Sequence, residues 1–194
     1  MSPRFVIKTQ KAHCMEGAML AAAALEFHGA RPQVLDLRSA AHDFDHVVAV
    51  FKRYGHFGAI SKTNHAVLRY REPVYKTIRE LALSYFHEYF DDKGGKTLRD
   101  YSEAFDLRYF DVHPPLTPPI KGGEFKSSLP LVGSPPAGGR EGVNWRTSAE
   151  NLFEIPEKLD NSKHYKILSR KQLANLRKAD KIEIKAGKLV EFSE

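Results

Sequence analysis

The chain has 194 residues, of which 42% are hydrophobic and 28% are charged, and this globular composition excludes wholesale disorder, a coiled coil and a collagen-like fibre. The single cysteine, Cys14, excludes an internal disulfide framework and a Cys-rich zinc site, and it fits a reducing compartment. The formal charge of +6 is spread along the sequence and forms no basic stripe of the kind that nucleic-acid binding uses. We therefore expect no nucleic acid among its partners.

One apolar run near the N-terminus, residues 17–25, raises the question of a membrane or secretion signal. It is about half as long as the roughly 18 residues that a membrane span needs. Basic residues between Arg4 and Lys11 precede it, so a cleaved signal peptide must be weighed. Glu16 at the edge of the run argues against that reading, and cleavage there would remove the only cysteine. We expect a cytoplasmic protein with no membrane partner.

Residues 114–142 differ from the rest of the chain, because they hold seven of the 11 prolines and six of the 13 glycines. No hydrophobic period runs through them, and such a composition buries too little apolar surface to offset its chain entropy. The sequence predicts a disordered insertion there, with an ordered Pro-rich docking loop as the alternative. It separates a main body, 1–113, from a C-terminal piece, 143–194, which we expect Trp145 to anchor to the main body.

The main body begins with an alanine-rich helix predicted over residues 13–28, because apolar residues recur at helical spacing and Gly29 follows at the capping position. Runs of β-branched and apolar residues then predict strands, and an amphipathic pattern predicts a second helix. The expected strands are 33–37, 46–51, 57–61 and 66–71, the second helix is 74–90, and the C-terminal piece has helices at 147–159 and 169–178 and a hairpin at 182–192.

Short connections make neighbouring strands antiparallel, so the fold class is α+β. We expect the cysteine-bearing N-terminal helix to pack on a small antiparallel sheet, with flanking helices. The sequence contains no glycine-rich phosphate loop such as GxxxxGK[ST].

Cys14 stands in the first turn of the predicted helix, where unpaired backbone N–H groups and the positive end of the dipole favour an anion. Such a position favours the thiolate form, which is the nucleophile in cysteine chemistry. The alternative role is that of a small, buried apolar residue.

His46 begins the valine-rich strand and is the candidate base. If the strands at 46–51 and 57–61 form a hairpin with Phe51 facing His56, His46 lies directly opposite Ser61. We expect His46 to share a sheet face with the valines of its strand and to meet the N-terminus of a helix packed on that face. A satisfied core histidine is the alternative.

A resemblance to a known family rests on this order of residues. A cysteine that opens a helix, a histidine that starts the next long strand and a polar group on the following strand resemble the transglutaminase-like superfamily, which belongs to the papain-like thiol enzymes. More narrowly, the sequence is similar to small bacterial proteins assigned to that superfamily, over about residues 10–112 and again near Trp145. The segments that carry this similarity are HCMEGAMLAAAALEFHG, QVLDL, DHVVAVF, GHFGAISKTNHAVLRYREPVY and IRELALSYFHEYF.

The resemblance implies that Cys14 is the nucleophile and His46 the histidine of a catalytic triad. The third member is normally an aspartate four residues after an aromatic, and here Phe57 holds the aromatic place and Ser61 the aspartate place. A hydroxyl fixes the imidazole tautomer, but it does not stabilise the imidazolium as a carboxylate does. Asn64 is a second candidate for orienting the ring, as an asparagine does in papain-like proteases.

The activity that follows is nucleophilic acyl transfer through a thioester, by a cysteine-dependent acyltransferase or a peptidase or amidase. A peptide, a protein or a small amide is the expected substrate, and no cofactor is expected. The backbone N–H of Cys14 and the side chain of Gln10 are the candidate oxyanion donors.

Two other readings stay open at this stage. The missing aspartate favours a non-catalytic binding protein that keeps the fold. Metal binding would use His42 and His46 with the two aspartates between them, but this spacing straddles a loop and a strand start rather than one helical face, so we expect no metal site. The remaining residues considered for that site are His13, His56 and His65.

Overall fold

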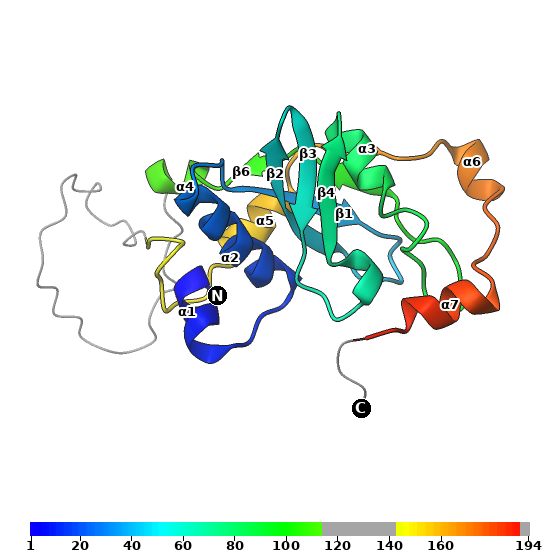
Figure 1. Cartoon of the computed structure of the whole chain (residues 1–194), viewed down its shortest axis with the longest axis horizontal. Coiled ribbons are helices and arrows are strands. Elements are labelled where there is room, and N and C mark those ends of the chain that lie inside the picture. Colours follow the sequence, from blue (N-terminus) through cyan, green and yellow to red (C-terminus); the bar gives the residue numbers. More distant parts are fainter. Residues whose placement is uncertain (114–142, 191–194) are drawn as a thin grey trace, which may run out of the picture.

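A computed structural model describes residues 1–113 and 143–190, and these residues combine helices with an antiparallel sheet, as the sequence predicts (Figure 1). The expected disordered insertion at 114–142 lies outside the described residues.

The sheet has the strand order β4-β3-β2-β1-β5-β7, and β6 pairs with β1 beside β5. Its three central strands match the apolar runs of the sequence, whereas the short strands β5, β6 and β7 were not predicted. The strands are β1 (Gln33–Arg38), β2 (His46–Arg53), β3 (His56–Ile60), β4 (Tyr70–Tyr75), β5 (Asp100–Ser102), β6 (Phe105–Asp106) and β7 (His164–Lys166).

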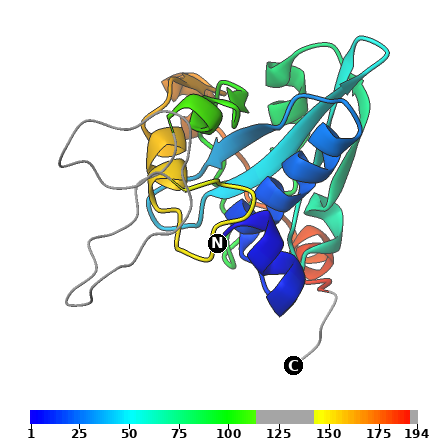
Figure 2. The same ribbon diagram turned by 90° about the vertical axis from the view of Figure 1, so that its left-hand side faces the viewer.

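Helices cover both faces of the sheet, and α1 packs beside α2 on one of them (Figure 2). The helices of the described residues are α1 (Pro3–Thr9), α2 (Cys14–Phe27), α3 (Ile78–Leu83), α4 (Tyr109–Val112), α5 (Glu154–Asp160), α6 (Arg170–Ala174) and α7 (Lys181–Gly187), with a 3₁₀ turn at Ala66–Leu68.

Side-chain alternation along β2 divides the core into two clusters. Val47 and Ala49 pack against α2, in a cluster that also contains the fully buried Trp145. Val48 and Val50 face the other way, toward α3 and the aromatic residues that follow it. Trp145 therefore joins the residues after 142 to the main body, as expected.

The β2–β3 hairpin has a different register from the one predicted. Its turn consists of Tyr54 and Gly55, which have φ values of 50° and 81°, so the loop is shorter than expected. Strand β2 extends to Arg53, and β3 starts one residue earlier than predicted, at His56. Val50 pairs with Ala59 instead of Phe57, which shifts the pairing by two positions. Because side chains alternate with a period of two, the shift leaves every side chain on its expected face.

The region after β3 departs further from the prediction. A strand was expected at 66–71, but β4 begins at Tyr70 and extends into the residues where a helix was expected. Helix α3 starts only at Ile78, where Thr77 caps it by accepting a hydrogen bond from the Glu80 N–H (3.1 Å). The β-branched and aromatic residues before Thr77 favour the strand instead.

The C-terminal helices α5 and α6 are shorter than expected, and the hairpin predicted at 182–192 is wrong. Lys181–Gly187 is the helix α7, and Asp180 caps it by accepting hydrogen bonds from the N–H groups of Ile182 and Glu183 (both 2.9 Å). Asp180 and Glu183 have the spacing of a capping box, and that signal favours a helix over the predicted hairpin.

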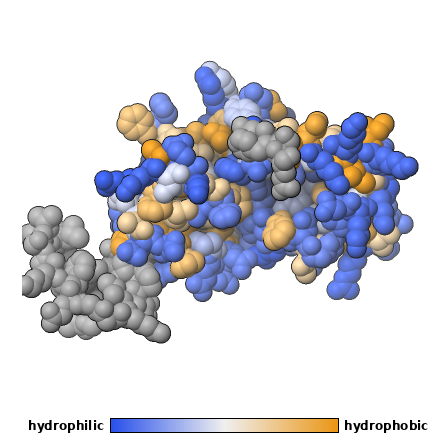
Figure 3. Space-filling view, turned by 90° about the horizontal axis from the view of Figure 1, so that it is seen from below, coloured by the Kyte–Doolittle hydropathy of each residue, from blue (hydrophilic) through white to orange (hydrophobic). Residues whose placement is uncertain are grey.

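The face of the molecule that carries α1 and α7 is mostly hydrophilic, and its hydrophobic residues lie in separate patches (Figure 3). None of the helices in the described residues has the length and apolar character needed to cross a membrane.

Candidate functional site

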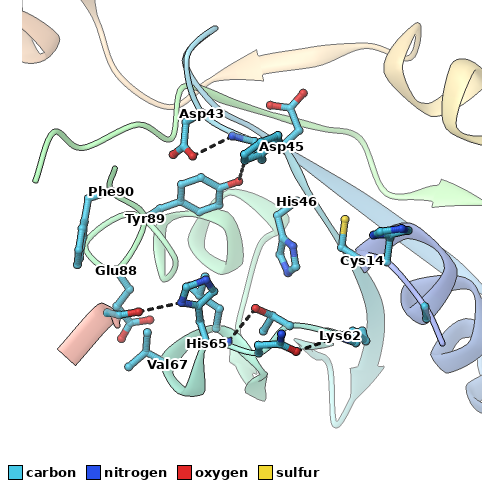
Figure 4. Close-up of a pocket in the computed structure, with 17 residues that line it drawn as sticks. Cys14, Asp43, Asp45, His46, Lys62, His65, Val67, Glu88, Tyr89 and Phe90 are labelled. Carbon is cyan, nitrogen blue, oxygen red and sulfur yellow. Dashed lines mark hydrogen bonds between the residues drawn. The ribbon is translucent and has the colours of Figure 1, made fainter. Parts of the chain in front are cut away.

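A pocket of about 390 Å³ lies where the first turn of α2, the start of β2 and the segment after β3 come together. Figure 4 shows the side chains that line it, and in this view the His46 ring lies between Tyr89 and the Cys14 sulfur. Helix α7 closes part of the rim, because Gly187 lines the pocket and its carbonyl accepts a hydrogen bond from His65 Nδ1 (2.8 Å).

Cys14 is the first residue of α2, and its side chain is half-buried at the pocket wall. His13 precedes the helix, and its backbone N–H donates to the Glu16 carboxylate (2.6 Å). The first intrahelical bond around this end runs from Gly17 N–H to the His13 carbonyl (3.0 Å). The backbone N–H groups of Cys14 and the next residue thus have no carbonyl of their own helix to bond, and they are available to an anion.

His46 is the first residue of β2, and only 9% of it is exposed. Its Nε2 forms a hydrogen bond with Ser61 Oγ, which is the partner that the sequence predicts. The contact is made although His46 and Ser61 are not register partners. Ser61 follows the last residue of β3, and the observed register places it opposite Val48, two positions from His46 on the same face of β2.

The electrostatics of His46 differ from those of a histidine paired with a carboxylate. Burial, and to a smaller extent the nearby His65, lower the pKa of His46 to about 4. The ring is therefore neutral at pH 7. It can accept a proton, but it is a weak base and does not form a resting ion pair with a thiolate.

Cys14 and His46 line the same pocket, but α2 packs on a different face of the sheet from the one predicted. We expected α2 to pack on the sheet face that His46 shares with Val48, but α2 packs on the opposite face, against Val47 and Ala49. The two side chains line a common pocket because α2 and β2 both begin there, so the pocket lies at the start of β2.

Two further expected site residues do not take up their predicted roles in this structure. Asn64 lines the pocket, but it is exposed and its Oδ1 accepts from Lys62 Nζ (3.0 Å), while the His46 ring is bonded to Ser61. Gln10 does not line the pocket, and its amide donates to the carbonyl of Ile7 (2.7 Å). Gln10 has a left-handed backbone (φ 56°) and is the C-cap of α1.

Tyr89 is a pocket residue whose role the sequence analysis missed. The sequence analysis placed it only within the helix predicted at 74–90, and it is 6% exposed. Its hydroxyl donates to the carbonyl of Phe44 and so holds the loop before β2 against the pocket. Burial raises the pKa of Tyr89 above its ordinary value, which keeps this donor protonated. No local pattern joins positions so far apart in the chain.

Carboxylates of the same loop are held by neighbouring groups rather than by His46. Asp43 accepts from Thr97 Oγ1 (2.5 Å), and Asp45 accepts from the backbone N–H of Ser39 (2.7 Å). Neither carboxylate replaces the missing aspartate of the triad.

The candidate metal ligands are also dispersed. His42 contacts Asp91 (3.2 Å), and His56 Nδ1 bonds to the Tyr54 carbonyl (2.9 Å). Within residues 1–113 and 143–190, no three His, Cys, Asp or Glu side chains come together in a group that could hold a metal ion.

In comparisons with known proteins, no family model matches the chain and no curated protein is significantly similar to it.

Proposed function

We propose that the protein is a thiol-dependent acyltransferase or amide hydrolase of the transglutaminase-like type, in which Cys14 is the nucleophile and His46 the general base. The observation that supports this most is the shared pocket: a cysteine at the start of a 14-residue helix and a buried, neutral imidazole both line it.

The reaction starts with transfer of the Cys14 thiol proton to the His46 ring while sulfur attacks the substrate carbonyl carbon. A C–S bond forms, the carbonyl oxygen takes up negative charge, and backbone N–H groups at the start of α2 stabilise that charge. The bond from carbonyl carbon to the leaving amine or alcohol then breaks, and the leaving group takes the proton from His46. Water or an amine attacks the thioester, its proton returns to sulfur through the ring, and Cys14 is regenerated.

Ser61 acts as a positioning residue in this scheme. When Nε2 of His46 carries the proton and donates to Ser61 Oγ, Nδ1 keeps the lone pair that accepts the thiol proton. The hydroxyl sets this tautomer without adding the charge stabilisation of a carboxylate. We expect slower chemistry than an aspartate would give.

A non-catalytic binding protein is the second candidate, and one observation favours it. His46 is bonded to a neutral hydroxyl, and no hydrogen bond of the Cys14 sulfur is found among the described residues. In that case the pocket binds its ligand without forming a bond to sulfur.

Intact-mass spectrometry with an activated ester, p-nitrophenyl acetate, separates the two functions. The proposed enzyme gains one acetyl group on Cys14 within the first turnover, and Cys14→Ser gains none. His46→Gln slows the acylation at least a hundredfold, within the range for loss of a general base. Acetylation of lysines with no modification of Cys14 would reject the enzyme and leave the binding protein.

Three further substitutions provide a control and a test of the role of Ser61. His56→Gln changes a histidine that does not line the pocket, so it leaves the acylation rate at the wild-type value. Ser61→Ala slows acylation about tenfold and Ser61→Thr, which keeps the hydroxyl, restores most of the rate. If Ser61→Ala and Ser61→Thr are equally slow, Ser61 does not position the ring.

A further inference from the structure

A second cavity, of about 560 Å³, runs along α2 next to the pocket that holds Cys14. The α2 residues that line it recur every three or four positions, twice as adjacent pairs, so they form one stripe of the helix that begins one turn after Cys14. The stripe runs from Gly17 to His28, the C-cap of α2, which corresponds to about 16 Å at the helical rise of 1.5 Å per residue. Between these ends the stripe consists of Leu20, Ala21, Ala24 and Leu25.

The groove is lined mostly by apolar residues, with a smaller number of polar and basic ones. Val6 of α1 and Ile60 of β3 complete its apolar wall, while Lys62, Thr63 and Arg69 lie along the other side. A slot of this kind suits an alkyl chain whose polar end lies outside it.

The groove and the candidate catalytic pocket share three lining residues, Ala12, Lys62 and Thr63. Lys62 forms the wall between them, and Gly17 makes this wall possible: a Cβ on Gly17 would lie 2.2 Å from the Cβ of Lys62. The lysine stem therefore rests directly on α2, one turn from Cys14. Ser61, which lines the groove, also holds the His46 ring, so the groove reaches the residues that would act on a carbonyl.

The two cavities differ in chemistry. The catalytic pocket carries charged and polar side chains, among them Asp45, Asn64 and Glu88. The groove carries mostly aliphatic ones. A substrate that spans both has an apolar acyl chain on one side of its carbonyl and a polar leaving group on the other.

We propose that the groove along α2 binds the alkyl chain of an acyl substrate, a medium- or long-chain ester or amide, and presents its carbonyl to Cys14. This inference rests on the proposed function for the covalent step, which forms the C–S bond to the acyl carbon and releases the polar alcohol or amine with the proton from His46.

A chain-length series of p-nitrophenyl esters tests the substrate class. Each buried methylene contributes about a fourfold gain in binding. The octanoyl ester therefore acylates Cys14 at least tenfold faster, in kcat/KM, than the acetyl ester. Ala24→Glu, at an exposed groove position, removes this preference, so that the octanoyl and acetyl esters react at similar rates. Phe27→Glu, on the same helix but outside the groove, leaves the preference intact.

A binding measurement on Cys14→Ser separates failure of this inference from failure of the proposed function. The fluorescent fatty acid 11-(dansylamino)undecanoate binds this variant, and adding Ala24→Glu weakens binding at least tenfold. Ala24→Trp is a second groove variant, used if Ala24→Glu does not fold, and we expect it to weaken binding to the same extent. Binding without any acylation of Cys14 would support the groove and reject the thiol chemistry. The groove is not an acyl site if Cys14 is acylated without a chain-length preference and Ala24→Glu does not weaken binding of the probe.

Discussion

Two histidines whose side chains are largely shielded from solvent have different partners. His46 lies at the start of β2 beside the pocket, and its Nε2 is bonded to the hydroxyl of Ser61. His164 lies at the start of β7, and its Nε2 is 3.1 Å from a carboxylate oxygen of Asp36 on β1. Thus a histidine–aspartate pair is present, but it is not the pair that lines the candidate catalytic pocket.

The two pairs lie on opposite faces of the sheet. His46 pairs with Leu37 and Asp36 pairs with Val47, so the two sites are one position apart in the β1–β2 register. Because neighbouring positions point to opposite faces, Asp36 cannot reach His46. A shift of one residue in either strand would exchange the two environments.

The bonds around His164 indicate which ring nitrogen donates. Nδ1 lies 2.8 Å from the Ser162 carbonyl, which only accepts, so Nδ1 carries a proton. Burial raises the pKa of Asp36, and the hydrogen bond with His164 opposes this rise only in part. His46 has no such charged partner, and its lowered pKa keeps it neutral. The carboxylate of Asp36 thus helps to join β7 to the sheet, whereas the base in the pocket, His46, is uncharged.

Breaking the histidine–aspartate pair has the largest expected effect. Asp36→Ala leaves the buried His164 ring without its partner, and we expect a loss of about 4 kcal/mol in the free energy of unfolding. Asp36→Asn costs less than half as much, because its amide can donate to Nε2. Urea denaturation at pH 7 measures both variants. A loss below about 1 kcal/mol for Asp36→Ala would show that the pair does not secure β7.

The pH dependence of stability sharpens the contrast for His46. Its pKa is about 4 in the folded protein and near 6.5 in an unfolded chain, so between these values the unfolded state binds more protons. The stabilisation is complete above pH 6.5 and is lost as the pH falls toward 4, by about 3 kcal/mol.

The comparison variant is His46→Gln, which removes the titrating group. The difference in unfolding free energy between wild type and His46→Gln should shrink by about 3 kcal/mol from pH 7 to pH 4. A difference that stays constant with pH would mean that the pKa of His46 is not lowered.

A carboxylate placed beside His46 tests whether the hydrogen-bond partner of this ring sets its protonation state. In Ser61→Asp an anion lies where the hydroxyl bonds to His46, and a close opposite charge raises the pKa of an imidazole by about 1–3 units. NMR titration of the His46 ring measures this shift, with Ser61→Thr as the neutral control. An unchanged pKa in Ser61→Asp would show that burial alone controls the ring.

Much of the central sheet and the start of the cysteine helix could be predicted from the sequence, because local hydrophobic patterns specify them. Cys14 opens α2, His46 opens β2, and the His46–Ser61 contact forms as expected. The contact survived a wrong register because a shift of two positions preserves the faces of the strands.

The remaining errors come from contacts between distant parts of the chain. Strand β7 is too short to carry a hydrophobic pattern, and it joins the sheet through pairing with β5 and through His164, which lies 128 positions from Asp36. The packing of α2 on the face opposite His46 also depends on the whole core, including Trp145. Periodicity shows which residues share a face, but it does not show which element covers that face.

The central claim is that Cys14 and His46 act as one chemical unit, and the pH profile of Cys14 acylation by p-nitrophenyl acetate tests it most directly. With His46 as a neutral base, the rate rises through pH 4 to a plateau near pH 5–7, and His46→Gln removes both the rise and the plateau. Wild-type and His46→Gln profiles that coincide from pH 4 to pH 8 would contradict the claim.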